Sequence, residues 1–246
     1  MESDHFKGKE PLAHVAEKQA FGLISSKEAH GLEIPGHIHA GCDAARDTAV
    51  TLLLVFTLLT PIVSNKVALI EELGLFVLGY GLWKMGRSAW LGWGRLERLH
   101  RMLQQERWEI QHNRPQEREE LEVLYGAKGF EGKLLEKVVD VLMADESRLL
   151  RVMIEEEMGV QLQQTEHPLK QGLGALIGSI VSGVLCLFGL WIYPEWGLPI
   201  AALTSIAACG AMVAIKAHNR SLDAIIWNLG LAVLAWGTLY FGIKLI

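Results

Sequence analysis

Glutamates recur at regular intervals in the middle of the chain, and their spacing suits a metal ion. Glu106 and Glu109 are three residues apart, so on a helix they share one face. Glu117 and Glu120 repeat this spacing after Pro115, a residue that suits the first turn of a new helix. If the chain reverses between the two helices, the two pairs of carboxylates face each other. The pattern predicts a cluster of acidic metal ligands.

A thioether and a further carboxylate follow later in the same region. Met153 and Glu157 are four residues apart, so they also share a helix face. Oxygen ligands alone suit Ca²⁺ or Mg²⁺, whereas a nearby thioether favours Fe²⁺, Mn²⁺ or another transition metal. The opposing interpretation is a solvated acidic surface paired with Arg107, Arg118 and Arg151. The predicted metal ligands are Glu106, Glu109, Glu117, Glu120, Met153 and Glu157.

Charged residues are confined to one part of the chain. Of the 246 residues, 50% are hydrophobic and 21% are charged. Only six of the 51 charged residues lie within residues 170–246. This segregation excludes a plain soluble globule, a disordered chain and a collagen-like one. The net charge of −5 argues against nucleic acid as a partner, because a phosphate binder needs a basic face.

Apolar stretches predict an all-α membrane protein with five transmembrane helices. About 20 apolar residues cross the hydrocarbon core of a lipid bilayer as a helix. Four stretches meet this length without any charge: residues 48–65, 171–194, 196–215 and 224–243. A fifth, residues 67–90, is apolar in bulk but contains Glu71, Glu72, Lys84 and Arg87.

The distribution of basic residues predicts the orientation. With the N-terminus in the cytoplasm, residues 1–46, 84–170 and 216–223 lie inside and contain 21 of the 23 Lys and Arg. Only Lys66 and Lys244 remain outside. Because cytoplasmic loops are enriched in Lys and Arg, we expect the N-terminus and the acidic insert to be cytoplasmic.

The region between the second and third spans predicts a small helical domain. The second span is expected to continue as a helix to about Asn113, followed by helices over residues 115–125 and 131–143. Asp145 is a predicted N-cap for a helix over residues 146–158. The chain then divides into a polar tail, spans one and two, a cytoplasmic three-helix insert and spans three to five. The respective residues are 1–45, 46–94, 95–168 and 169–246.

Cys186 and Cys209 lie in apolar stretches and are interpreted as small buried packing residues. Cys42, Cys186 and Cys209 form neither a disulfide framework nor a zinc pattern. Gly174 and Gly178 form a GxxxG, which indicates close helix packing within one chain or, alternatively, dimerisation.

Histidines before the first span form a weaker candidate site. His30, Glu33, His37 and His39 lie close together in the sequence and are either a metal-collecting cluster or part of a polar tail.

The acidic insert resembles the metal-binding domain of the vacuolar iron transporter family, and the likeness covers residues 45–246. The matching motifs are Glu106-x-x-Glu109, Pro115-Gln-Glu117-x-x-Glu120-Leu, Tyr125-x-Ala-Lys-Gly129 and Met153-Ile-x-x-Glu157-Met-Gly159. Arg46-Asp47 and Met85-Gly-x-Ser-Ala-Trp90-Leu resemble family segments at the cytoplasmic ends of the first two spans. The resemblance implies a homodimer with the pore between subunits and proton-coupled export of Fe²⁺ or Mn²⁺.

The chain departs from the family within the pore. Leu53-Leu54-Val55 stands where the family has an Asn-Asp-Gly with an intramembrane Asp, and Val77 falls near the family's intramembrane Glu. The path residues that we predict instead are Asp47, Glu72 and Met85. Lys84 either opposes a cation at the pore mouth, extends to the headgroups or pairs with an acid such as Asp47.

The leading hypothesis is a transporter that exports Fe²⁺ or Mn²⁺ from the cytosol without a resident cofactor. The alternatives are a membrane-bound metal sensor or buffer and a structural or interaction protein. No nucleophile–base pair, P-loop or dinucleotide motif is recognisable, so an enzyme is not predicted. The membrane would be the plasma membrane in a prokaryote and the vacuolar or another internal membrane in a eukaryote.

Overall fold

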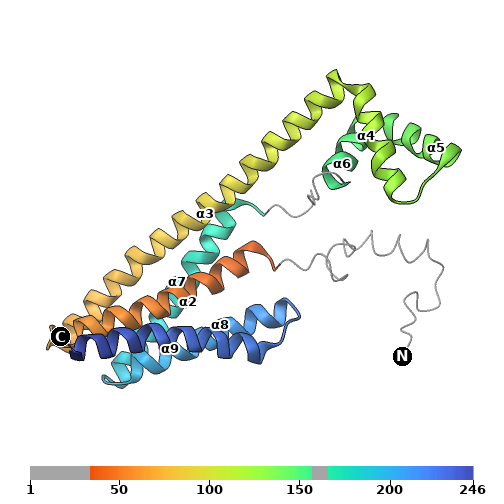
Figure 1. The fold of residues 1–246 in the computed structure, drawn as a ribbon. Helices are drawn as coiled ribbons and strands as arrows, with labels where there is room; N and C mark the ends of the chain where they lie inside the picture. Colours follow the sequence, from red (N-terminus) through yellow and green to blue (C-terminus); the bar gives the residue numbers. More distant parts are fainter. Residues whose placement is uncertain (1–33, 157–165, 246) are drawn as a thin grey trace, which may run out of the picture. The chain divides into compact units, whose positions relative to one another are not determined.

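A computed structural model of the chain describes residues 34–156 and 166–245. These residues form eight helices and no strand (Figure 1). The helices are α2 (Gly36–Leu59), α3 (Lys66–His112), α4 (Arg114–Ala127), α5 (Gly132–Met143), α6 (Glu146–Glu156), α7 (Pro168–Ile192), α8 (Gly197–Lys216) and α9 (Ser221–Leu245).

The described residues divide into two compact units, with the boundary inside α3. We call residues 34–88 and 170–245 the bundle unit, and residues 89–156 and 166–169 the insert unit. The all-helical prediction is confirmed for these residues. Because α3 is one uninterrupted helix, it supplies side chains to both units.

Three helices of the bundle unit, α7, α8 and α9, are long and apolar enough to cross a membrane. They coincide with the last three predicted spans. The first predicted span, residues 48–65, extends beyond α2, which ends at Leu59, and the second lies in α3, which carries charged side chains along its apolar stretch. Spans through α2 and α3 therefore remain a prediction.

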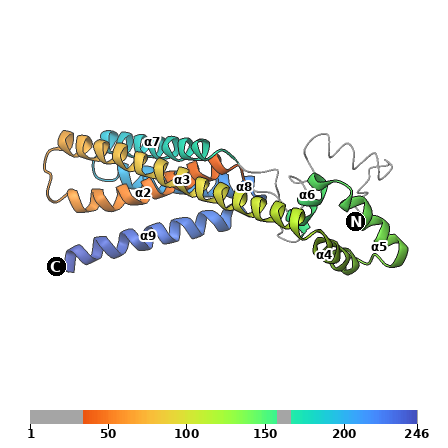
Figure 2. The ribbon, with the colours of Figure 1, turned by 90° about the horizontal axis from the view of Figure 1, so that it is seen from above.

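Glycines allow α7 to approach its neighbours closely in the bundle unit (Figure 2). A Cβ atom on Gly174 would overlap the backbone carbonyl of His37 in α2, and one on Gly178 would overlap that of Gly41. A Cβ on Gly183 would overlap the side chain of Val77 in α3. The GxxxG is thus used for packing inside one chain, as one of the two interpretations predicted.

The helix ends of the insert unit follow their local sequence signals. Pro115 occupies the first turn of α4, where its missing N–H costs nothing. Asp145 caps α6, because the Arg148 backbone N–H donates to Asp145 Oδ1 over 2.7 Å. Gly129, after α4, has a φ of +92°, a conformation that favours glycine. The predicted helices of the insert are confirmed up to Glu156, and the predicted stop at Gly159 lies outside the described residues.

Candidate functional site

Two of the predicted metal ligands are buried carboxylates in the insert unit. Glu106 on α3 is 1% exposed and Glu117 on α4 is 3% exposed. Glutamate is almost never fully buried without a compensating partner. Burying a carboxylate is costly unless opposite charge and hydrogen bonds compensate for the lost water. Two such residues in one small unit therefore mark a functional-site candidate.

The helix faces that carry these glutamates converge on the predicted thioether ligand. Ile110 and Leu121 lie one turn after Glu106 and Glu117, on the same helix faces. Both pack in one apolar cluster with Met153 of α6, which is fully buried. Figure 1 shows α4, α5 and α6 gathered beside the C-terminal part of α3. The fold thus directs Glu106, Glu117 and Met153 towards the same core.

The remaining predicted ligands are placed differently. Glu109 is half-buried and accepts a hydrogen bond from Gln105 over 3.0 Å, and Glu120 is exposed. Glu157 lies outside the described residues. Within the residues that the structure describes, no three His, Cys, Asp or Glu side chains gather closely enough to hold a metal ion. The described part of the site is two inward carboxylates and one thioether.

Arg118 does not pair with the predicted ligands, although it follows Glu117 directly. Its guanidinium donates to Asp140 over 2.7 Å and to Glu122 over 3.2 Å. The hydrogen bond to Asp140 raises the pKa of Arg118 above its usual value, because it stabilises the charged form. The bridge ties α4 to α5, whereas Glu117 itself is buried.

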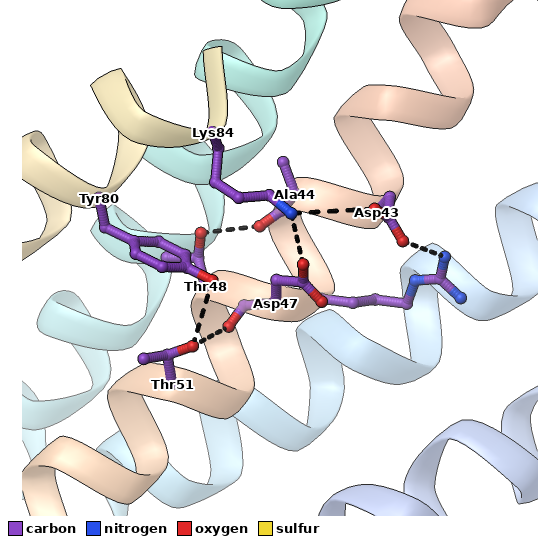
Figure 3. Close-up of polar contacts among 8 residues, drawn as sticks. Asp43, Ala44, Asp47, Thr48, Thr51, Tyr80 and Lys84 are labelled. Atoms are coloured by element: carbon purple, nitrogen blue, oxygen red, sulfur yellow. Dashed lines mark hydrogen bonds and ion pairs between the residues drawn. The ribbon is translucent and has the colours of Figure 1, made fainter. Parts of the chain in front are cut away.

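A second polar cluster lies in the bundle unit, between α2 and α3 (Figure 3). Lys84 of α3 is only 5% exposed and forms ion pairs with Asp47 and Asp43 of α2, the latter over 3.8 Å. Pairing with Asp47 was one of three alternatives for this lysine, and it is the one observed. A buried ammonium needs such partners, since an uncompensated charge is costly there.

Asp43 and Asn228 of this cluster were not singled out by the sequence. Arg46 donates to Asp43 over 3.2 Å and to Asn228 of α9 over 3.0 Å. Asp43 therefore connects Lys84 to Arg46, and Asn228 extends the cluster to a third helix. We call Asp43, Arg46, Asp47, Lys84 and Asn228 the polar cluster.

Hydroxyl groups line α2 below the polar cluster. Thr51 donates to the Asp47 backbone carbonyl over 2.6 Å and lies 3.4 Å from the Tyr80 hydroxyl (Figure 3). Thr48, Thr57 and Thr60 donate to carbonyls one turn earlier in the same way. Thr57 also accepts a hydrogen bond from Trp236 Nε1 of α9 over 2.9 Å, so this hydroxyl links α2 to α9.

The predicted path residues of α3 lie on its outer surface. Glu72 is exposed and Met85 is half-buried. They are thirteen residues apart, so the helical repeat places them on different sides of α3. Glu72 is instead in register with Gly79 and Gly86, both exposed, and a Cβ on either glycine would meet open space. Glu71, next to Glu72, is nearly in register with Met85.

The comparison with known protein families covers the insert unit, α7, α8 and α9 but not α2. The family model described as the VIT family matches residues 85–245, which is most of the chain. The chain belongs to the VIT family. A curated relative, the vacuolar iron transporter of Acanthamoeba castellanii (strain ATCC 30010 / Neff), is 31% identical over 106 residues. That match covers 43% of the chain and 40% of the relative. Membership of the VIT family, with the three long apolar helices, identifies an integral membrane protein.

Proposed function

We propose that this VIT-family protein is a metal transporter that moves Fe²⁺ or Mn²⁺ out of the cytosol. The observation that carries the proposal is the burial of Glu106 and Glu117 beside the core that contains Met153. Carboxylates with a thioether suit a borderline divalent cation better than Ca²⁺ or Mg²⁺. Glu109, Glu120 and Glu157 would complete the receiving site on the insert unit. The relative named as an iron transporter supports iron as cargo.

The proposed topology has five spans, through α2, α3, α7, α8 and α9, with the N-terminus and the insert in the cytoplasm. The concentration of Lys and Arg on the proposed cytoplasmic side supports this orientation. The polar cluster would then lie at the cytoplasmic end of the path. We propose proton coupling because the resemblance to the vacuolar iron transporter family implies it.

We further propose a homodimer that meets on the outer face of α3. Glu72, Gly79 and Gly86 recur at every seventh residue, which places them in one line along the helix. Helices in a membrane associate through small residues that let their backbones approach closely. A second copy on this line would enclose the exposed Glu72 carboxylate, which a single chain leaves open.

The assembly is expected to have the mass of two 27.3 kDa chains in detergent, measured by light scattering over a wide concentration range. Replacing Gly79 and Gly86 together by Leu should shift the protein to a monomer, because both side chains would project into the contact. Gly230→Leu on α9 is the matched control, since a Cβ there also meets open space. A wild type that is monomeric throughout, or a dimer that only Gly230→Leu disrupts, contradicts this interface.

Metal uptake tests the transport function directly. Purified protein in proteoliposomes is expected to move Fe²⁺ and Mn²⁺ across the bilayer, and an opposing proton gradient should accelerate the movement. A fluorescent indicator trapped in the vesicles reports the flux. Vesicles whose flux equals that of protein-free vesicles would contradict transport.

A metal sensor or buffer is the second candidate function. The observation that favours it is the first predicted span, where Leu53 is fully buried in the apolar core. This position lies in the segment where the resemblance implies an intramembrane Asp. Binding of Fe²⁺ by the full-length chain without any uptake would establish this alternative.

A further inference from the structure

Three sulfur atoms lie together between α2 and α8 of the bundle unit. The Cys42 thiol of α2 donates to the Met212 thioether of α8, with 3.6 Å between Sγ and Sδ. Cys42 is also within hydrogen-bonding reach of the Cys209 thiol. Cys209 and Met212 are three residues apart, so they share one face of α8. Residues far apart in the sequence thus place two thiols and a thioether around one point.

The spacing of the sulfur atoms fits a common metal ion. A thiolate binds a metal at about 2.3 Å, so sulfur ligands around one ion lie roughly 4 Å apart. The 3.6 Å between Cys42 Sγ and Met212 Sδ is close to that separation. Small rotations of the side chains would admit an ion, and the two helices pack directly on each other.

The composition of the ligand set selects the metal. In the described residues no third His, Cys, Asp or Glu joins Cys42 and Cys209 in a metal-binding group, so Met212 is the third ligand. Zinc is usually bound by Cys, His and Asp or Glu, whereas a thioether beside thiolates favours Cu(I). Fe²⁺ and Mn²⁺ prefer sites that include oxygen or nitrogen. The sulfur cluster is therefore poorly suited to the proposed cargo.

Charge and access also suit a thiolate site. Arg46 lies one turn after Cys42 on α2, and its positive charge acts on the Cys42 sulfur. Cys42 is 7% exposed, whereas Met212 is 49% exposed. Met212 also lies one turn before Lys216, where α8 ends. The Met212 thioether is therefore the most exposed of the three sulfur ligands and lies close to a helix end, whereas the two thiols are less exposed.

The geometry points to a Cu(I)-binding site formed by Cys42, Cys209 and Met212. The site is distinct from the acidic insert, because all three ligands belong to the bundle unit. An ion held by these three residues would link α2 to α8 directly. It would lie near Arg46, which belongs to the polar cluster. This assigns the chain a second metal specificity, for a soft monovalent cation.

Competition with a chromophoric chelator tests the site on the full-length protein. Reduced, anaerobic protein in detergent is titrated against the Cu(I) complex of bathocuproine disulfonate. The wild type is expected to withdraw about one Cu(I) per chain, as one trigonal sulfur site requires. Cys42→Ser with Cys209→Ser should withdraw none. Met212→Leu should bind about tenfold more weakly, equivalent to about 1.4 kcal/mol.

Two matched variants serve as controls for other sulfur atoms. Cys186→Ser removes the third cysteine, which is buried elsewhere in the bundle core, and Met143→Leu removes a half-buried thioether of the insert that has no role in either site. Both should withdraw Cu(I) like the wild type. Elution volume and helical content establish that each variant is folded, and X-ray absorption should report a copper shell of sulfur alone.

Three results would overturn the assignment. The first is a wild type that leaves all Cu(I) with the chelator. The second is a folded Cys42→Ser, Cys209→Ser variant that withdraws as much copper as the wild type. The third is a copper shell dominated by nitrogen or oxygen.

Discussion

Replacing Glu106 and Glu117 together by Gln is expected to abolish most Fe²⁺ binding by the full-length protein. Both glutamate side chains are buried. Glutamine has nearly the same volume as glutamate, so each substitution removes the negative charge without opening a cavity. A tenfold loss for each carboxylate corresponds to a combined loss of about a hundredfold, or about 2.7 kcal/mol. Anaerobic calorimetric titration measures the affinity. Metal-dependent thermal stabilisation should disappear in parallel, because only bound metal stabilises the folded state.

The matched control replaces one exposed glutamate on each of the same helices. Glu97 of α3 and Glu119 of α4 are both exposed, so Glu97→Gln with Glu119→Gln changes the net charge equally. This control should bind Fe²⁺ like the wild type. If both double variants lose affinity to the same extent, the effect is long-range electrostatics and the buried glutamates are not ligands. An unchanged titration in Glu106→Gln, Glu117→Gln would remove the site altogether.

The helices of the insert were predictable because their signals are local. Pro115 and Asp145 act within one turn of the helix that each begins, so no distant residue changes their effect. The same spacing showed that Glu106 and Glu109 share a face. It did not show which of the two points inward. That choice depends on Ile110, which belongs to the same apolar cluster as Met153 and turns its side of α3 towards the core.

The contacts of the bundle unit depend on residues far apart in the sequence. The partners of Lys84 lie on a different helix, and three alternatives for this lysine remained open until α2 and α3 were placed together. Cys42 and Met212 are 170 positions apart, so no local pattern in the sequence predicts their contact. Helix periodicity defines the face on which a residue lies. It does not identify the helix that packs against that face.

The second prediction is that Glu72 and Met85 of α3 contact the cation as it crosses the membrane. A cation that crosses the bilayer centre must exchange its water for protein ligands, because an uncompensated ion in hydrocarbon is very costly. Glu72 and Met85 carry the strong ligands that we assign to the path, and both are accessible in the single chain. Glu72→Gln and Met85→Ala should each reduce Fe²⁺ flux about tenfold or more, since losing one ligand raises the barrier by about 1.4 kcal/mol.

Neighbouring residues make this prediction specific. Glu71→Gln is the matched control for Glu72→Gln, because both carboxylates are exposed but only Glu72 is in register with Gly79 and Gly86. Lys84→Met keeps the buried stem volume and removes the positive charge that neutralises Asp47. It should leave flux unchanged or raise it, because a cation at the pore mouth then meets an unpaired carboxylate. Flux lost in Glu71→Gln but kept in Glu72→Gln would replace Glu72 by Glu71 as the acidic residue of the path. Flux abolished by Lys84→Met would show that the ion pair with Asp47 holds the transporting conformation together.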